Sequence, residues 1–124
     1  MPKTKITIYQ KSYATVPLCD WLDSLSKRGK VKCIEKIERL QALGHELRRP
    51  DCDYLTEGIY ELSATAGNAN YRILYAFTGK DVVLLSHGLT KKKKVPKREI
   101  ERAAKNLAEY RRNPQNHTFE GEIR

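Results

Sequence analysis

The chain has 124 residues, a formal net charge of +9, and 31% charged and 40% hydrophobic residues. This length suits one domain with one core, and the composition is typical of a globular protein rather than a disordered one. No apolar run is long enough to cross a bilayer, and the first residues lack the apolar stretch of a signal peptide. We therefore expect a cytoplasmic protein.

The cysteines and histidines do not predict a metal site or a disulfide framework. Cys19, Cys33 and Cys52 are odd in number and show no Cys-x-x-Cys spacing, which favours free thiols in a reducing compartment. The three histidines are scattered and fit no zinc spacing. We expect neither a bound metal nor a cofactor.

The positive charge is concentrated near the C-terminal end of the chain. Residues 88–112 contain ten lysines and arginines but only three acidic residues, and four of the lysines are consecutive, at positions 91–94. A surface of this kind is suited to a polyanion, such as a nucleic acid, or to an acidic protein partner.

The first half of the chain predicts one strand and two helices. Residues 5–9 alternate in polarity and are rich in β-branched side chains, as strands are. A helix is expected from Pro17, and Gly29 is expected to separate it from a second helix over residues 31–43 that ends at Gly44. The apolar stripes are Leu18, Trp21, Leu22 and Leu25 in the first helix, and Val31, Ile34, Ile37 and Leu40 in the second.

The second half predicts a sheet followed by a helix. Residues 48–56 are expected to form a polar connection, and strands are expected over 59–64, 70–77 and 82–89. A helix is expected over 97–111, and residues 113–124 show no periodicity, so we expect a flexible tail after a single domain of residues 1–112. The order β-α-α-β-β-β-α predicts an α+β fold in which a small, mostly antiparallel sheet packs against a helical hairpin.

Several short strings occur along the chain in an order that resembles a known superfamily. They are Glu46-Leu47-Arg48 with Pro50, Gly58-Ile59-Tyr60-Glu61-Leu62, Tyr71-Arg72-Ile73-Leu74-Tyr75, Val83-Leu84-Leu85, His87-Gly88-Leu89, Lys91-Lys92 and Pro96-Lys97-Arg98-Glu99-Ile100-Glu101. Together they resemble the RelE/ParE superfamily of toxins from type II toxin–antitoxin systems, in particular its HigB-like, phage-derived branch. The resemblance covers about residues 5–110 and implies a RelE-like fold.

The resemblance also implies a function. Such proteins are usually ribosome-dependent endoribonucleases that cut mRNA without a metal or cofactor. A cognate antitoxin, often a helix-turn-helix protein, neutralises them. The expected partners are therefore an antitoxin, the ribosome and mRNA, and we expect a toxin that inhibits translation and growth.

Cleavage of RNA without a metal requires groups that move protons and stabilise the charge on the reacting phosphate. The catalytic candidates are Arg72, Lys92, Lys93, His87 and Glu61, of which the resemblance points to Arg72 and the lysines. A guanidinium can hold a phosphate through two parallel hydrogen bonds. The alternatives are an exposed arginine or an ion pair with Glu61.

The roles of His87 and Glu61 are left open by the sequence. Strict alternation places His87 on one face of its strand with Val83 and Leu85, whereas Arg72 shares a face with Leu74. His87 is either an acid–base group or a structural histidine. Glu61 either accepts a proton or forms a cross-strand salt bridge.

Candidates for binding RNA are Arg48, Arg49, Lys91, Lys94, Arg98 and Tyr110, which offer positive charge and, for the tyrosine, stacking. Each has an ordinary alternative: the arginines as surface residues, the lysines as a solvated loop or a docking site for an acidic antitoxin segment. Tyr110 could instead hold the last helix to the sheet.

Two positions depart from the pattern of the superfamily. A basic residue is common near the position of Asp53, and an arginine is common where this chain has Ser63. Both changes remove positive charge from the expected site. The competing functions are a ParE-like inhibitor of DNA gyrase, because one fold serves both activities, and a catalytically weak module that only binds RNA or its antitoxin.

Overall fold

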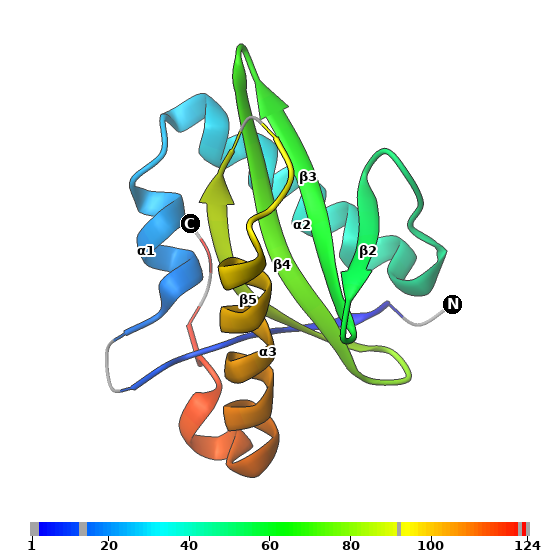
Figure 1. The fold of residues 1–124 in the computed structure, drawn as a ribbon, viewed down its shortest axis with the longest axis vertical. Coiled ribbons are helices and arrows are strands. Elements are labelled where there is room, and N and C mark those ends of the chain that lie inside the picture. Colours follow the sequence, from blue (N-terminus) through cyan, green and yellow to red (C-terminus); the bar gives the residue numbers. More distant parts are fainter. Residues whose placement is uncertain (1–2, 13–14, 92, 122, 124) are drawn as a thin grey trace.

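The computed structural model describes residues 3–12, 15–91, 93–121 and 123. Its elements follow the chain as drawn in Figure 1. They are β1 (Lys5–Ile8), α1 (Pro17–Asp23), α2 (Lys27–Leu43), the short 3₁₀ helix η1 (Gly44–Glu46), β2 (Cys52–Thr56), β3 (Ile59–Ala66), β4 (Ala69–Gly79), β5 (Val82–Thr90), α3 (Lys97–Arg112) and the 3₁₀ helix η2 (Pro114–His117). Among the described residues, no helix is both long and apolar enough to cross a membrane.

The strands form one sheet in the order β1-β5-β4-β3-β2, in which only the β1–β5 pair is parallel. The α+β fold with a mostly antiparallel sheet is therefore confirmed, and it is consistent with a RelE-like fold. The expectation of a polar connection over residues 48–56 was wrong for its second half. Cys52–Thr56 alternates in burial and pairs with β3 as an edge strand, although its polar residues and the preceding Pro50 suggested a loop.

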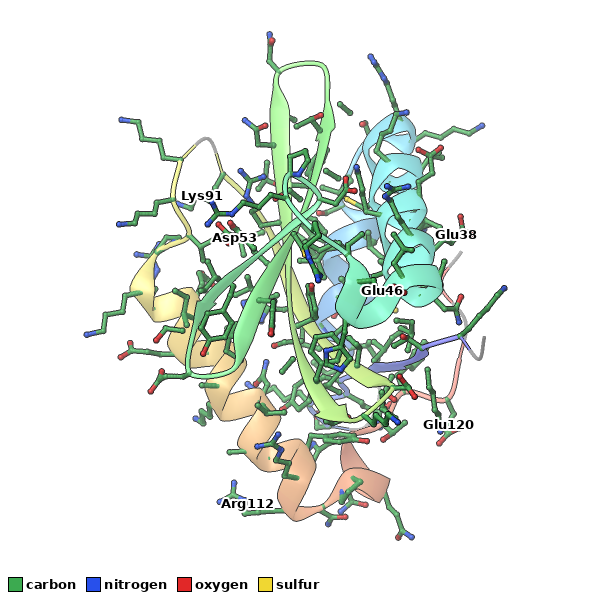
Figure 2. All side chains as sticks on the ribbon, turned by 90° about the vertical axis from the view of Figure 1, so that its right-hand side faces the viewer. Glu38, Glu46, Asp53, Lys91, Arg112 and Glu120 are labelled. Carbon is green, nitrogen blue, oxygen red and sulfur yellow. The ribbon has the colours of Figure 1, made fainter. Side chains whose placement is uncertain are left out.

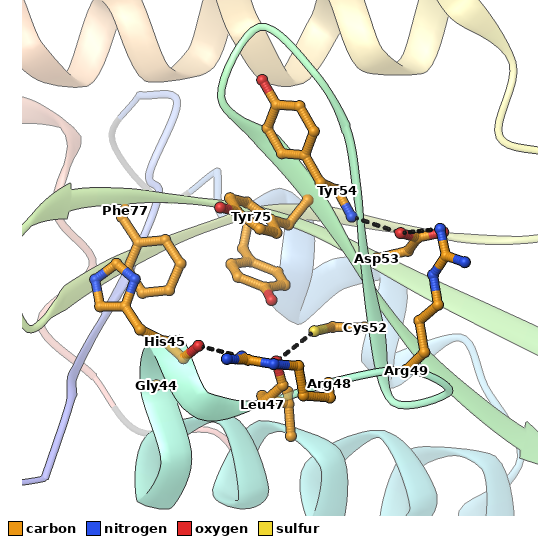
Figure 3. A pocket seen from close by; sticks show the side chains of 11 residues that line it. Gly44, His45, Leu47, Arg48, Arg49, Cys52, Asp53, Tyr54, Tyr75 and Phe77 are labelled. Atoms are coloured by element: carbon orange, nitrogen blue, oxygen red, sulfur yellow. Dashed lines mark hydrogen bonds and ion pairs between the residues drawn. The ribbon is translucent and has the colours of Figure 1, made fainter.

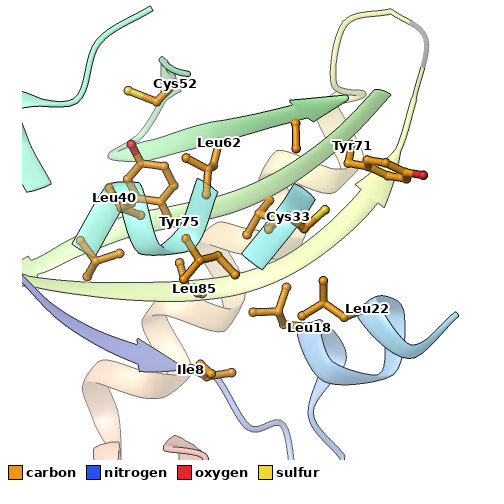
Figure 4. Close-up of a cluster of buried hydrophobic side chains, with 14 of the residues drawn as sticks. Ile8, Leu18, Leu22, Cys33, Leu40, Cys52, Leu62, Tyr71, Tyr75 and Leu85 are labelled. Atoms are coloured by element: carbon orange, nitrogen blue, oxygen red, sulfur yellow. The ribbon is translucent and has the colours of Figure 1, made fainter. Parts of the chain in front are cut away.

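Helices α1 and α2 both cover one face of the sheet, where the larger of two hydrophobic cores lies (Figure 4). Leu18 and Leu22 of α1 and Cys33, Ile37 and Leu40 of α2 are buried against side chains of the three central strands. Trp21 packs on Gly88 of β5, as its place in the helical stripe suggested.

Helix α2 starts earlier than the sequence predicted. The side chain of Ser26 accepts a hydrogen bond from the Gly29 backbone N–H at 3.1 Å, so Gly29 lies in the first turn instead of ending the previous helix. A Cβ at Gly29 would collide with the Tyr71 hydroxyl, which explains a glycine here. The buried stripe is rotated accordingly, and Val31, expected in the core, is 46% exposed.

Helix α3 packs on the opposite face of the sheet. Its Ala103 and Leu107 join Leu74, Leu84 and Leu89 in a second hydrophobic core. In Figure 2 α3 and the segment that leads into it lie on one side of the sheet, and α2 lies on the other. We call the face that carries α3 the α3 face, and the face that carries α1 and α2 the α2 face.

The residues after α3 return to the sheet. Asn113–His117 turn back, Thr118 forms an isolated bridge with Tyr9, and the Phe119 N–H donates to the Ile8 carbonyl at 2.9 Å. The Phe119 side chain packs against the larger core. The aperiodic sequence after α3 therefore includes a segment with a defined place beside β1.

Candidate functional site

The most conspicuous polar group on the α3 face is the pair formed by Arg72 and Glu61. Ser63 is the cross-strand partner of Arg72, and Glu61 is the partner of Leu74, so Arg72 and Glu61 occupy diagonal positions on β4 and β3. Arg72 Nε lies 3.2 Å from Glu61 Oε1, and their side chains are only 19% and 17% exposed. Arg72 Nη1 also donates a hydrogen bond to the backbone carbonyl of Tyr71 at 3.1 Å, so two contacts hold the guanidinium in place.

The environment of Glu61 raises its pKa. Burial raises the pKa of Glu61, the nearby Asp53 raises it further, and Arg72 acts in the opposite direction. The net pKa lies above the usual value for a glutamate, which makes this carboxylate a better proton acceptor near neutral pH than an exposed one. Both the acid–base role and the salt bridge considered from the sequence are compatible with this geometry.

The lysine segment begins beside this pair. The Lys91 N–H donates to the Asn70 carbonyl at 2.9 Å, which continues the β4–β5 ladder one residue past the end of β5. Because Tyr71 pairs with Thr90 and Arg72 with Leu89, Lys91 follows on the same face as Arg72. Figure 2 labels Lys91 on the side of the sheet that carries α3.

The other basic candidates of this region surround the start of α3. Lys93 and Lys94 are exposed in the connection, and Lys92 lies outside the described residues. Arg98, in the first turn of α3, is 75% exposed, with its Nε 4.0 Å from Glu99 Oε2. The α3 face thus combines a partly buried Arg–Glu pair with long, exposed, positively charged side chains. Such an arrangement is suited to a phosphate backbone.

The face predicted for His87 was wrong. A register shift between Leu74 and Tyr75 places Ser86 as an extra residue in β5, so His87 pairs with Leu74 rather than following the alternation of Val83 and Leu85. A β-bulge reverses the side chains that follow it. His87 therefore lies on the α3 face, diagonal to Arg72.

His87 is at the centre of a buried polar network that fixes α3 to the sheet. Asn106 of α3 donates to Ser86 Oγ at 2.9 Å, Ser86 Oγ lies 2.8 Å from His87 Nδ1, and His87 Nε2 lies 3.0 Å from Glu99 Oε1. The histidine is only 1% exposed. In a neutral imidazole, Nδ1 accepts a hydrogen bond from Ser86 and Nε2–H donates one to Glu99. Every hydrogen bond of this network can therefore form with His87 uncharged.

Electrostatics agree with a neutral His87. Burial lowers the pKa of His87, as does the charge of Arg102, and the bond to Glu99 opposes them only in part. Both ring nitrogens are engaged and the ring is shielded from solvent, so this geometry favours the structural role over direct acid–base chemistry. Ser86, Glu99 and Asn106 were missed from the sequence, although a polar Asn106 within the apolar stripe of α3 was a signal of a buried polar contact.

Among the RNA-binding candidates, Arg48 and Tyr110 lie away from Arg72, whereas Arg49 pairs with Asp53, the cross-strand neighbour of Glu61. Arg48 follows η1 and lines a cavity with Tyr60 and Tyr75, whose side chains are on the α2 face. Arg49 is exposed at the β2 edge, 3.0 Å from Asp53. Tyr110 is half-buried at the far end of α3, where it packs against the smaller core.

The two positions that depart from the superfamily pattern lie next to the Arg72–Glu61 pair. Asp53 is the direct cross-strand partner of Glu61, and Ser63 is that of Arg72. Asp53 places a carboxylate, itself paired with Arg49, beside Glu61. Ser63 adds no positive charge opposite Arg72.

A comparison with protein-family models finds one that matches residues 20–108 of the chain, described as "Phage derived protein Gp49-like (DUF891)". The match begins in α1 and ends within α3, so it contains Glu61, Arg72, His87 and the basic segment that leads into α3. No curated protein matches the chain at a significant level.

Proposed function

The chain belongs to the Gp49-like family of phage-derived proteins, a toxin-like, RelE/HigB-type family of toxin–antitoxin systems, and from this premise we propose that it is an mRNA endonuclease that acts on the ribosome. The observation that supports the proposal most is the Arg72–Glu61 pair, partly buried on the same face as the basic segment that starts at Lys91.

In the proposed reaction the 2′-hydroxyl of one nucleotide attacks the adjacent phosphorus. The 2′-oxygen forms the new bond to phosphorus as its proton passes to Glu61, whose raised pKa suits a base. Arg72 stabilises the charge that develops on the non-bridging oxygens. The bond to the 5′-oxygen then breaks, and this oxygen takes a proton from an ammonium of the basic segment, for which we propose Lys93 or Lys92.

The ribosome supplies what the small site lacks. It would hold the message so that the phosphate meets Arg72, while Lys91, Lys94 and Arg98 contact neighbouring phosphates. The proposed place of action is accordingly the cytoplasm. An antitoxin would neutralise the protein by covering the basic α3 face or by preventing entry to the ribosome.

Primer extension on a defined mRNA in a reconstituted translation reaction tests the proposal, with and without ribosomes. Cuts that need ribosomes are expected for the wild type, and Arg72→Gln is expected to lower the cleavage rate by about 10²–10³-fold, the cost of losing one donor to the developing charge. Arg28→Gln removes the same charge from the exposed surface of α2 and serves as the matched control.

A second candidate is a module that binds RNA or its antitoxin with little catalysis. The placement of Asp53 beside Glu61 supports it, because a carboxylate paired with Arg49 stands where the superfamily pattern commonly has a basic residue, and Glu61 already offsets the charge of Arg72. In this case the same assay shows no cuts, while RNA binding is retained. Growth arrest without cuts and without RNA binding would instead favour another target, such as DNA gyrase.

A further inference from the structure

A concave site lies at the edge of the sheet, on the α2 face. It is a cavity of about 430 Å³ between η1 and strands β2, β3 and β4, within the range usual for small-molecule sites. Its lining includes the aromatic rings of His45, Tyr54, Tyr60, Tyr75 and Phe77 (Figure 3). None of these residues takes part in the Arg72–Glu61 pair.

The aromatic rings of this cavity are held in place rather than freely exposed. Tyr54 is 53% exposed, yet its hydroxyl accepts a hydrogen bond from the Gly58 N–H at 2.9 Å, and its ring packs edge-on against Tyr60. His45 stacks on Phe77 with ring centroids 3.7 Å apart, and its Nε2–H donates to the Lys80 carbonyl at 2.8 Å. Two sides of the cavity are therefore preorganised flat surfaces.

Positive charge lies next to these rings. Arg48 Nη1 donates to the carbonyls of His45 and Leu47, at 2.6 and 3.1 Å, which positions the guanidinium at the cavity. Within the described residues, its Nε and Nη2 make no hydrogen bond or ion pair, so they can serve a ligand. Arg49 balances the acidic residue of the lining, Asp53, at 3.0 Å.

We propose that this cavity binds one nucleotide of an RNA strand, with the base stacked on Tyr54 and the phosphate held by Arg48. Single-stranded RNA is commonly recognised by aromatic and arginine planes on which unpaired bases stack, and an arginine binds phosphate through several donors. An excess of positive over negative side chains around flat rings matches an anionic aromatic ligand better than an uncharged one.

The position of the cavity links it to the α3 face, and in this respect the inference rests on the proposed function. Asp53 belongs to the rim of the cavity and is also the direct cross-strand partner of Glu61. The two sites therefore lie on opposite faces of the sheet and approach one another at its β2 edge. An RNA strand that passes around this edge could occupy both, with one nucleotide in the cavity and the reacting phosphate at Arg72.

The proposal is tested with adenosine 5′-monophosphate and the ¹⁵N-labelled full-length protein, by following amide chemical shifts in NMR spectra. The nucleotide is expected to shift resonances of residues 45–60 and to bind more tightly than adenosine, which lacks the phosphate. Tyr54→Leu is expected to weaken binding about tenfold, within the range for the loss of one base–aromatic stack. Arg48→Gln should abolish the preference for the phosphorylated ligand.

Tyr54→Phe is the matched control, because it keeps the ring and removes only the hydroxyl that accepts from Gly58. It should bind within about twofold of the wild type, and thermal unfolding of each variant verifies that it folds. Shifts confined to Arg72 and Lys91, or equal affinities of Tyr54→Leu and the wild type, would overturn the proposal. So would an aromatic, acidic peptide that shifts these resonances when the nucleotide does not.

This experiment separates the two proposals. Binding of the mononucleotide requires no cleavage, so a protein that binds it at Tyr54 but cuts no mRNA would refute the nuclease and leave the nucleotide site intact. Ribosome-dependent cleavage with no nucleotide bound near Tyr54 would refute the second site alone.

Discussion

Removing the charge of Arg72 leaves the carboxylate of Glu61 partly buried without its partner, and this has a consequence that can be measured without RNA. Coulomb's law at an effective dielectric constant of about 20 gives an attraction of about 5 kcal/mol for unit charges 3.2 Å apart. Desolvation of the two groups offsets much of this. We expect Arg72→Gln to lower the free energy of unfolding by about 2 kcal/mol at pH 8.

The loss should depend on pH in a defined direction. Burial and Asp53 already raise the pKa of Glu61, and Arg72 is the group that lowers it, so the variant has a still higher pKa at Glu61. The folded variant then keeps a proton that the unfolded chain releases near the ordinary glutamate pKa of about 4.3. Its stability is therefore retained below that pH and falls as the pH rises through the folded pKa of Glu61.

Urea unfolding at intervals between pH 4 and pH 8 measures this difference. The wild type and the double variant Glu61→Gln/Arg72→Gln are the controls. The double variant has no unpaired carboxylate at position 61, so it should lose less stability than Arg72→Gln at pH 8. A difference between Arg72→Gln and the wild type that stays constant across the range would refute the electrostatic reasoning and indicate a loss of packing alone.

Three further changes probe the scaffold of the site. The pKa of His87 is lowered in the folded protein, so below about pH 6.5 the unfolded chain binds a proton at this residue more readily than the folded chain does. The free energy of unfolding of the wild type should therefore fall as the pH drops from 6.5, and His87→Gln should lack this contribution when measured by urea unfolding. Gly88→Ala should cost about 1–3 kcal/mol in thermal unfolding because its Cβ collides with the Trp21 ring, whereas Gly79→Ala meets only ordinary contacts. Phe119→Ala should lower the free energy of unfolding by about 1–2 kcal/mol in urea, because the Phe119 ring packs against the larger core; an unchanged value would contradict this packing.

The sheet could be predicted wherever its strands alternate or are continuously apolar. Strands β3, β4 and β5 satisfy this, and they were expected within a few residues of their observed ends. Strand β2 is an edge strand in which Tyr54 and Thr56 are exposed and Asp53 is half-buried, so no apolar alternation marks it in the sequence. Its identity depends on pairing with β3, which is a tertiary interaction.

The composition of the α3 face could be predicted only in part. Arg72 and Glu61 were named as possible partners from their neighbouring strands, and they are paired. The position of His87 could not be obtained by alternation, because one extra residue at Ser86 reverses the side chains that follow. No local feature of the β5 sequence marks this bulge, which is stabilised by Asn106 of α3, 20 residues later in the chain.

The charges around Arg72 bear on how the proposed nuclease would be restricted to mRNA held on the ribosome. In the free protein Arg72 is paired with Glu61, and the neighbouring Asp53 is paired with Arg49. A free RNA phosphate must displace or share the Glu61 contact, which disfavours binding at this point. On the ribosome the message would be held by other contacts. The free-energy cost of separating Arg72 from Glu61 would then be offset by the positioning of the phosphate and not by tight binding of RNA to this protein. A low intrinsic affinity at Arg72, combined with basic residues at Lys91 and beyond, is what a nuclease dependent on the ribosome requires.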